Sequence, residues 1–268
     1  MTFSLEIKIT LIENVVKTFV LNYPTSVSRN IVLSNNYGAS GAFNLPKFKS
    51  EPFTDESGFT GDINKGGSCN VNIITFCPHN LTHIETSSHI TNNSEKSITI
   101  KDLEPETTNG LVYLIDCTDE KAIENNSISW DFLSEKFHSL DIIPKIIALK
   151  TKSSKLPQHY NFSGENFISL GSQVSKNIQK EFPEIQVLIL DLPSADNEND
   201  IKLMGHKEFF FTTEQTSATE KPLQKAIVEL AHFGQLEESY YFCMMTPAKI
   251  ETDAIVTDIL FWSLERKK

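Results

Sequence analysis

The sequence predicts a mixed α/β fold in which one sheet carries a few helices. Two near-continuous apolar runs, at 111–116 and 145–150, are typical of strands covered on both faces. Between them, 127–140 has helical spacing and a possible serine N-cap, as a crossover helix does. A second helix is predicted over 174–182, followed by a strand over 187–191. This alternation of strand and helix indicates that helices pack on a partly parallel sheet.

The N-terminal third adds strands and one long excursion. Residues 3–10 alternate apolar and polar side chains, as a half-buried strand does, and 17–23 are a second strand candidate. From 34 to 67 the chain is rich in Asn, Gly, Ser, Pro and Phe, which predicts a long irregular segment. Residues 69–76 are strand-like, and Pro78 marks the end of that strand.

The C-terminal third leaves one element open between two structures. Residues 222–236 are compatible with a helix opened by Pro222 or with a strand centred on 226–230. Residues 240–250 and 254–262 are typical of two buried strands. Because the chain contains neither an internal repeat nor a convincing linker, we expect a single domain over 1–268.

Composition and charge exclude several classes of function. Hydrophobic residues make up 39% of the 268 residues, and 18 are Phe, so a disordered chain is excluded. The net charge of −11 argues against nucleic acid and against anionic membrane surfaces as partners. No apolar run approaches the length of a membrane span, and charges interrupt the N-terminal apolar stretches. We therefore expect a cytoplasmic protein whose partner is a small molecule or another protein.

The segment 75–90 concentrates the residues that can carry chemistry. It holds three of the seven histidines and a carboxylate, at His79, His83, Glu85 and His89. On a helix, steps of 4, 6 and 10 residues reach about 40°, 240° and 280°, so these side chains would fan round the axis. A straight strand would separate the first from the last by roughly 33 Å. A sharply curved loop is the arrangement that brings all of them together.

Imidazole and carboxylate groups in such a cluster suit a divalent metal ion. These ligands are those of zinc, iron, manganese and other first-row ions. A catalytic ion would lower the pKa of a bound water enough to supply hydroxide near neutral pH. The alternative is a surface loop that is merely rich in histidine. The tight clustering favours metal binding or acid–base chemistry over that alternative.

The same stretch resembles the signature of the cyclase family, which includes bacterial kynurenine formamidase (arylformamidase). The family pattern is H-x-G-T-H-x-D-x-P-x-H. The positions in register are His79, Thr82, His83 and His89. The departures are Leu81 for Gly, Glu85 for Asp and Ser87 for Pro.

Two later segments extend the resemblance in sequence order. Residues 189–210 are similar to the family's Asp-x-x-Ser-x-Asp segment and its following metal-binding histidine, here His206. Residues 226–233 are similar to the stretch that carries a second bridging carboxylate, here Glu229. The resemblance implies a single α/β domain of the kynurenine formamidase/cyclase type (swivelling β/β/α-like), with a mixed sheet and a few helices.

The resemblance also implies roles for the site residues. His79, His83 and Glu85 would hold one metal ion, while His206 would hold a second together with Glu85 and Glu229. His89 would be the general acid and base rather than a ligand. Zinc is the expected ion and manganese the alternative, with one or two ions bound. The implied activity is hydrolysis of an N-formyl aryl amine, as in the kynurenine branch of tryptophan catabolism, or of a related ester. Family members also imply a homo-oligomer.

Several alternatives stay open at this point. Glu85 adds a methylene to the family's Asp, and the long spacing from His206 to Glu229 implies an insertion over 211–221, which weighs against the second ion. His232 competes with His206 as a ligand. Asp191, Ser194 and Asp196 are as compatible with a capped turn as with a family motif. The chain could also bind metal without catalysis, or perform dehydration, lactone formation or isomerisation.

Overall fold

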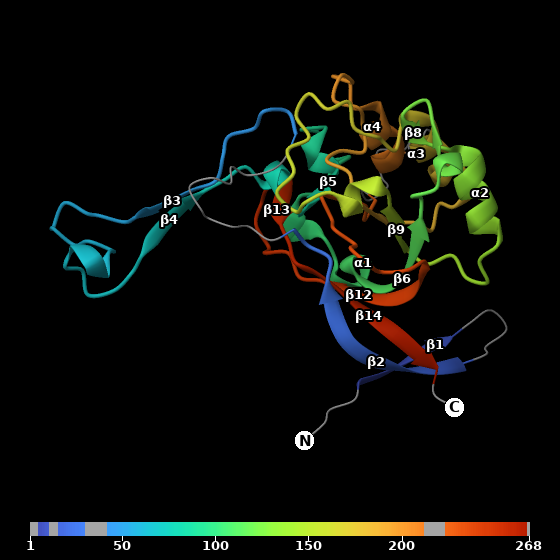
Figure 1. Ribbon diagram of the computed structural model, residues 1–268, viewed down its shortest axis with the longest axis horizontal. Helices are drawn as coiled ribbons and strands as arrows, with labels where there is room; N and C mark the ends of the chain where they lie inside the picture. Colours follow the sequence, from blue (N-terminus) through green and yellow to red (C-terminus); the bar gives the residue numbers. More distant parts are fainter. Residues whose placement is uncertain (1–4, 11–15, 30–41, 212–222, 267–268) are drawn as a thin grey trace.

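The computed structural model describes residues 5–10, 16–29, 42–211 and 223–266 (Figure 1). The strands of this part of the chain form one large mixed sheet of ten strands and two small two-stranded sheets. The order in the large sheet is β1-β2-β14-β12-β6-β9-β10-β11-β5-β13. The mixed α/β architecture with few helices is therefore as predicted.

The centre of the large sheet is parallel and fully covered. Its strands are β6 (Asn109–Asp116), β9 (Ile146–Lys150), β10 (Val187–Leu190) and β11 (Ala226–Glu229). They pair in parallel, and every residue of β9, β10 and β11 is buried. This burial explains the apolar runs of the sequence. The segment 222–236, which was compatible with a helix or a strand, contains β11.

Helices cover one face of this central sheet (Figure 1). They are α2 (Trp130–His138), α3 (Ser172–Glu181) and α4 (Met204–Phe210). Leu133 of α2, Ile178 of α3 and Phe209 of α4 join Leu149 and Leu188 of the sheet in one buried cluster. The helix expected over 127–140 begins only at Trp130, because Ser127–Ile128 forms a short strand, β8, paired with β7 (Ile123–Glu124). Helix α4 was not predicted.

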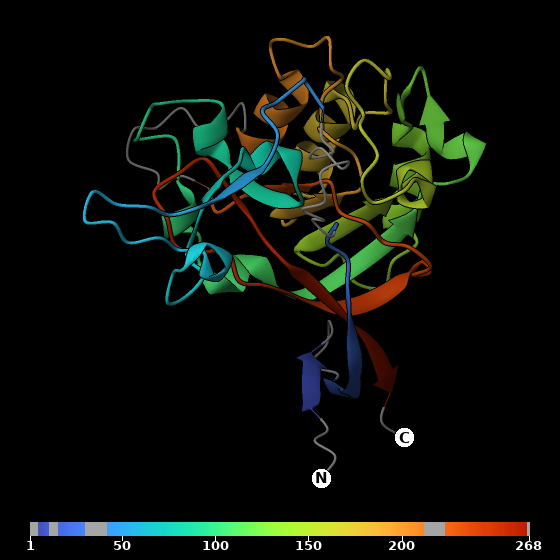
Figure 2. The same ribbon diagram turned by 60° about the vertical axis from the view of Figure 1, so that its left-hand side comes forward.

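The two ends of the sheet differ in form. At one end, β1 (Leu5–Thr10), β2 (Val16–Ser26), β14 (Ile259–Arg266) and β12 (Ser239–Met245) pair antiparallel. Figures 1 and 2 show the β1–β2 end lying below the body, near both chain termini. At the other end, β5 (His83–Thr86) lies between β11 and β13 (Ala254–Val256).

The predicted curved loop around His79–His89 is thus built on a strand. Strand β5 is flanked by two single 3₁₀ turns, η3 (Pro78–Asn80) and η4 (Ser87–His89). Two sharp turns on either side of a four-residue strand bring the outer histidines back over its face. The expectation of a curved segment was right in outline and wrong in its centre, which is regular β-structure.

The irregular excursion expected over 34–67 is only partly irregular. Residues 30–41 lie outside the described part of the chain, but β3 (Lys49–Pro52) pairs antiparallel with β4 (Asn72–Thr75). The resulting hairpin arm projects away from the body (Figure 1). Its exposed large apolar residues are Ile63, Val71, Ile73 and Ile74. The strand β3 was missed because four residues with three polar side chains carry little strand signal.

No helix in the described ranges is long and apolar enough to cross a membrane. The expectations of a cytoplasmic location and of a single domain over 1–268 stay predictions.

A buried lysine supports helix α4 from below. Lys225, just before β11, is 3% exposed, donates a hydrogen bond to the Phe209 carbonyl oxygen and lies 5.3 Å from the centroid of the Phe209 ring. Burial lowers the pKa of its ammonium group from 10.5 to about 7. The folded chain therefore binds fewer protons here than the unfolded chain between those pH values. The free energy of unfolding should therefore rise with pH across this window. The full destabilisation caused by burying the ammonium group should be present below about pH 7.

Replacing Lys225 by Met should raise the free energy of unfolding at pH 7 by on the order of 2 kcal/mol, because an apolar side chain removes the cost of burying an ammonium group. The gain should shrink as the pH rises from 7 to 10.5. Urea unfolding of both proteins at pH 6.5, 8.5 and 10 measures this. An equal difference in the free energy of unfolding between the two proteins at all three pH values would show that burial does not lower the pKa of Lys225.

Candidate metal centre

Three of the candidate ligands share one face of the sheet because of strand geometry. His83 and Glu85 are two residues apart on β5, so both point to the same side, while Ile84 between them packs into the apolar cluster on the opposite side. Glu229 of β11 lies directly opposite His83 in the antiparallel pairing. Ile227, which pairs with Glu85, packs in the helix-covered cluster. The candidate centre therefore lies on the helix-covered face.

Three more histidines converge on Glu85 from other elements. His79 comes from η3, His89 from η4 and His206 from α4. The distances from the Glu85 carboxylate oxygens are 3.6 Å to His79 Nδ1, 3.8 Å to His83 Nε2, 3.7 Å to His89 Nε2 and 2.8 Å to His206 Nε2. All six residues predicted for the site thus lie in one cluster.

Each of the two carboxylates, Glu85 and Glu229, lies close to histidines on two sides. Glu85 Oε2 is the oxygen near His79 and His83, and its Oε1 is the oxygen near His206. Likewise, Glu229 Oε2 lies 3.5 Å from His83 Nε2, and Glu229 Oε1 lies 3.3 Å from His206 Nε2. Each glutamate therefore lies between His83 and His206, with one carboxylate oxygen toward each histidine.

The outward nitrogen of every imidazole has an acceptor. The partners are the Leu81 carbonyl for His83 Nδ1 at 2.8 Å, Asp196 Oδ2 for His206 Nδ1 at 2.6 Å, and Asp253 Oδ2 for His79 Nε2 and His89 Nδ1, both at 3.1 Å. An acceptor on one ring nitrogen keeps the proton there and leaves the lone pair on the other. The four inward nitrogens are therefore the ones free to bind an ion or a proton.

The inward atoms fit a divalent cation. His83 Nε2, His206 Nε2 and both Glu85 oxygens are buried and make no hydrogen bond. The 2.8 Å contact of His206 with Glu85 is thus close without being a well-directed hydrogen bond. Ligand atoms about 2.1 Å from a tetrahedral ion lie about 3.4 Å apart, close to the 3.5–3.8 Å separations around His83 and Glu85. One combination within binding reach is His79, His83, Glu85 and Glu229, and another is Glu85, His89 and His206.

The electrostatics of the cluster call for positive charge. Burial raises the pKa of the Glu85 carboxyl, but His206 and His89 outweigh it and hold that pKa well below its usual value. Burial lowers the pKa of His206, yet Glu85 and Asp196 raise it well above the ordinary value. The same competition raises the pKa of His83 and of His89. The two carboxylates of this nearly closed site thus favour protonated, positively charged imidazoles. A bound dication would supply the same positive charge directly.

Asp196 fixes the position of His206 and of the helix that carries it. Its carboxylate accepts from the backbone N–H groups of Gly205 at 2.5 Å and His206 at 3.0 Å, in addition to the His206 ring. A Cβ at position 205 would lie 2.6 Å from Asp196 Oδ1, so only glycine permits this approach. Ser194, by contrast, accepts the Asp196 N–H as a turn cap does. The 191–196 segment therefore contains both a capped turn, at Ser194, and a carboxylate that orients a candidate metal ligand, at Asp196.

The departures from the family signature have local compensations. Leu81 has φ −130° and ψ 171°, an ordinary extended backbone that does not require glycine. Ser87 replaces a proline, and its hydroxyl accepts the Ile98 N–H, while the Thr86 hydroxyl donates to the Ile98 carbonyl. These bonds hold the segment before His89. Thr82 donates to the Leu230 carbonyl at 2.6 Å and thereby ties β5 to the residue after Glu229.

Three of the seven histidines lie outside the cluster, and one residue of the site was missed. His138, His159 and His232 are not part of the cluster, so His206 is the histidine placed beside Glu229. The proposed insertion over 211–221 falls almost wholly outside the described residues. Asp253 was missed because it is 164 residues from His89 along the chain and its motif carries no metal-ligand spacing.

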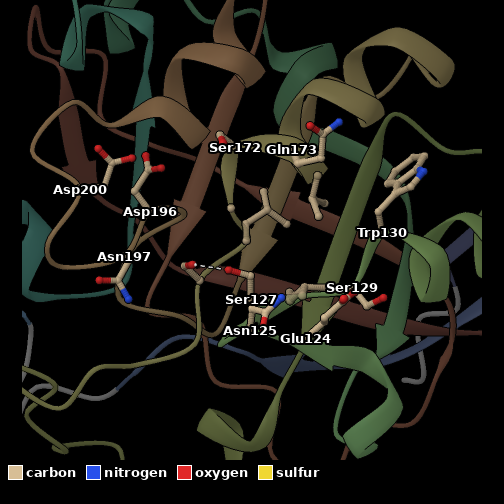
Figure 3. A pocket seen from close by; sticks show the side chains of 15 residues that line it. Glu124, Asn125, Ser127, Ser129, Trp130, Ser172, Gln173, Asp196, Asn197 and Asp200 are labelled. Carbon is tan, nitrogen blue, oxygen red and sulfur yellow. Dashed lines mark hydrogen bonds between the residues drawn. The ribbon is translucent and has the colours of Figure 1, made fainter.

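A separate pocket of about 460 Å³ is lined in part by Asp196, the acceptor of the His206 ring (Figure 3). Figure 3 shows Asp196, Asn197 and Asp200 on one side of it and Trp130 on the other. Asp196 lines this pocket and also accepts from His206 of the candidate centre, but none of the clustered histidines lines the pocket. Its contact with the site is therefore through the acceptor of His206.

Replacing Gly205 by Ala should weaken metal binding and lower stability by roughly 1–3 kcal/mol, because the new Cβ displaces the Asp196 carboxylate. Thermal unfolding and a chelator competition assay measure the two effects. The double variant Gly205→Ala with Asp196→Ala has no clash between the new Cβ and a carboxylate, but it still lacks the acceptor for the His206 ring. It should regain stability relative to Gly205→Ala without regaining metal affinity. Equal metal affinity in wild type, Gly205→Ala and the double variant would contradict the role given to Asp196.

Comparisons with known proteins bear on the fold and on the family of the chain. No curated protein matches the sequence. A predicted metal-dependent hydrolase from Bacillus stearothermophilus has a similar structure, with TM-score 0.63, 20% identity and coverage of 90% of this chain and 98% of that one. Isatin hydrolase A from Labrenzia aggregata gives TM-score 0.64, 15% identity and coverage of 91% and 94%.

A third structure, of a potential metal-dependent hydrolase with cyclase activity, gives TM-score 0.63 at 20% identity, with coverage of 92% and 99%. The family model described as "Putative cyclase" matches residues 11–197, which include β5 and both turns that flank it but end before His206. Because this match covers well over half of the sequence, the chain belongs to the cyclase family.

Proposed function

We propose that this chain is a metal-dependent hydrolase that cleaves an amide or ester bond in a small molecule. The observation that carries the proposal is the pair of carboxylates, Glu85 and Glu229, beside two buried imidazole nitrogens, His83 Nε2 and His206 Nε2, that make no hydrogen bond. Two similar structures described as metal-dependent hydrolases and one isatin hydrolase support the reaction class.

His79, His83 and Glu85 would hold one divalent ion, and His206 with Glu85 and Glu229 a second. Zinc suits this set of nitrogen and oxygen donors, and manganese is the alternative. Such ions supply hydroxide near neutral pH and stabilise developing negative charge on a carbonyl oxygen. The chain's own contribution is to fix the three ligand imidazoles, those of His79, His83 and His206, with acceptors on their outer nitrogens and to bury the centre.

His89 would move the proton. Its side chain is 23% exposed, against 0% for His83 and 1% for His206, so it lies at the open side of the centre, where a substrate can approach. Its Nε2 lies 3.7 Å from Glu85 Oε2, so the nitrogen faces the reacting position. From there it would take a proton during attack and give it to the leaving amine or alcohol.

The preferred substrate is an N-formyl aryl amine, by the resemblance to arylformamidase, and an aryl ester is the close alternative. A homo-oligomer in solution is part of the same proposal. Static light scattering of the purified protein measures the oligomer.

Purified protein grown with zinc and manganese should contain one or two equivalents of metal per chain and hydrolyse a formanilide or an aryl ester. Replacing His89 by Ala should keep the metal and reduce hydrolysis by about 10²- to 10⁴-fold, as loss of a general acid and base does. Elemental analysis and initial rates measure these effects. Protein without bound metal would contradict the hydrolase proposal. Metal without hydrolysis, unaffected by His89→Ala, would favour a binding role.

A conservative pair at position 85 tests the bridging carboxylate. Glu85→Asp should retain metal, because the family's own residue restores a carboxylate one methylene shorter, whereas Glu85→Ala should lose it. Glu95→Ala, on an exposed loop, is the matched control for removal of a glutamate. Metal content measured by elemental analysis decides the outcome, and full metal retention in Glu85→Ala would remove Glu85 from the ligand set.

A further inference from the structure

One carboxylate oxygen serves two histidines at the open side of the centre. Asp253 Oδ2 lies 3.1 Å from His79 Nε2 and 3.1 Å from His89 Nδ1. Both contacts satisfy hydrogen-bond geometry, and the two rings lie 4.5 Å apart between centroids. The same acceptor thus touches a proposed metal ligand and the proposed proton carrier.

The backbone holds Asp253 at this position independently of the histidines. It directly precedes β13, whose first residue, Ala254, pairs with Glu85. Its carbonyl oxygen accepts the Thr86 N–H at 3.0 Å. The Thr252 hydroxyl donates to the other carboxylate oxygen, Oδ1, at 3.1 Å, which leaves Oδ2 to the imidazoles. The strand that closes the sheet beside β5 therefore also delivers the acceptor.

We infer that Asp253 is a positioning residue that sets the tautomers and ring orientations of His79 and His89 together. This inference rests on the proposed function for the role of His89, and on geometry alone for the tautomers. An N–H on the outer nitrogen of each ring donates to Oδ2, so the lone pairs lie on His79 Nδ1 and His89 Nε2. These are the atoms 3.6 and 3.7 Å from Glu85 Oε2.

The competing interpretation makes Asp253 a third ligand, because His79, His89 and Asp253 are also within reach of a common ion. Burial argues against it. The Asp253 side chain is 41% exposed, whereas that of Glu85 is fully buried. An ion at Asp253 would bind the outer nitrogens of His79 and His89, which already donate to a hydrogen-bond acceptor. It would leave the inward nitrogens and the Glu85 carboxylate without a cation. A positioning role satisfies both sets of atoms at once.

Three variants separate these roles. Asp253→Ala removes the acceptor, and Asp253→Asn keeps an oxygen that can accept from both rings. Glu251→Ala is the matched control, because it removes a carboxylate two residues away that is 72% exposed and pairs with Lys101. Zinc-loaded proteins with ¹⁵N-labelled histidine are compared by long-range ¹H–¹⁵N NMR, which reports the tautomer of each ring, and by chelator competition and initial rates.

A positioning role predicts that wild type, Asp253→Asn and Glu251→Ala show His89 protonated on Nδ1. In Asp253→Ala the His89 signals should move toward a mixture of tautomers. That variant should keep its zinc stoichiometry, bind zinc about 10- to 100-fold more weakly, and lose about 10- to 100-fold in kcat with KM nearly unchanged. Asp253→Asn should recover most of each loss.

Two results would overturn the inference. One is loss of a full equivalent of zinc in both Asp253→Ala and Asp253→Asn, which would make Asp253 a ligand. The other is an Asp253→Ala spectrum identical to that of wild type. The NMR and zinc measurements need no substrate, so failure of wild type to hydrolyse formanilides or esters would reject the proposed function while leaving the tautomer assignment standing.

Discussion

Two carboxylates buried side by side place the strongest constraint on this molecule. Glu85 and Glu229 lie on neighbouring strands, one nearly and one fully excluded from solvent, and moving each charge out of water costs several kcal/mol. Such a pair persists only where positive charge meets it, on imidazoles or on a cation. The surrounding structure follows from that requirement: β5 is paired on both sides, and four histidines each turn one nitrogen toward Glu85. The sheet supplies the rigidity that a flexible loop would lack.

The outer acceptors connect this centre to the rest of the fold. Asp196 joins the segment after β10 to the start of α4, and Gly205 lets its carboxylate approach the helix. Leu203 before α4 and Leu230 after Glu229 adopt left-handed backbone conformations, with φ of 49° and 56°. For a leucine this costs on the order of 1–2 kcal/mol. Strain thus sits beside His206 and beside Glu229, where packing of α4 and β11 holds it in place.

The parts of this arrangement that could be predicted from the sequence are those set by neighbouring residues. The apolar runs of β9 and β10 and the spacing of His79, His83, Glu85 and His89 are short-range patterns, and they were readable. His206 and Glu229 were placed by family resemblance, since nothing in their own neighbourhoods distinguishes a ligand from a buried polar residue. Helix α4 was not, because seven residues opened by a leucine without a side-chain cap give no start signal. Asp253 could not be found at all: its partners are brought to it only by the pairing of β13 with β5.

The departures from the family signature show why a motif is better understood as a set of distances than as a set of letters. Glu85 is longer than the Asp it replaces, yet its oxygens lie within 3.8 Å of four imidazole nitrogens. The segment before His89 lacks the family's proline, but the Ser87 and Thr86 hydroxyls bind both polar groups of Ile98 and restrain the same turn. Restraint by hydrogen bonds to a neighbouring segment differs from restraint by a ring in one respect: it depends on that neighbour staying in place. The position of His89 is therefore coupled to 98–102 and, through the bonds of Ile100 and Lys101 to 250–252, to the segment that carries Asp253.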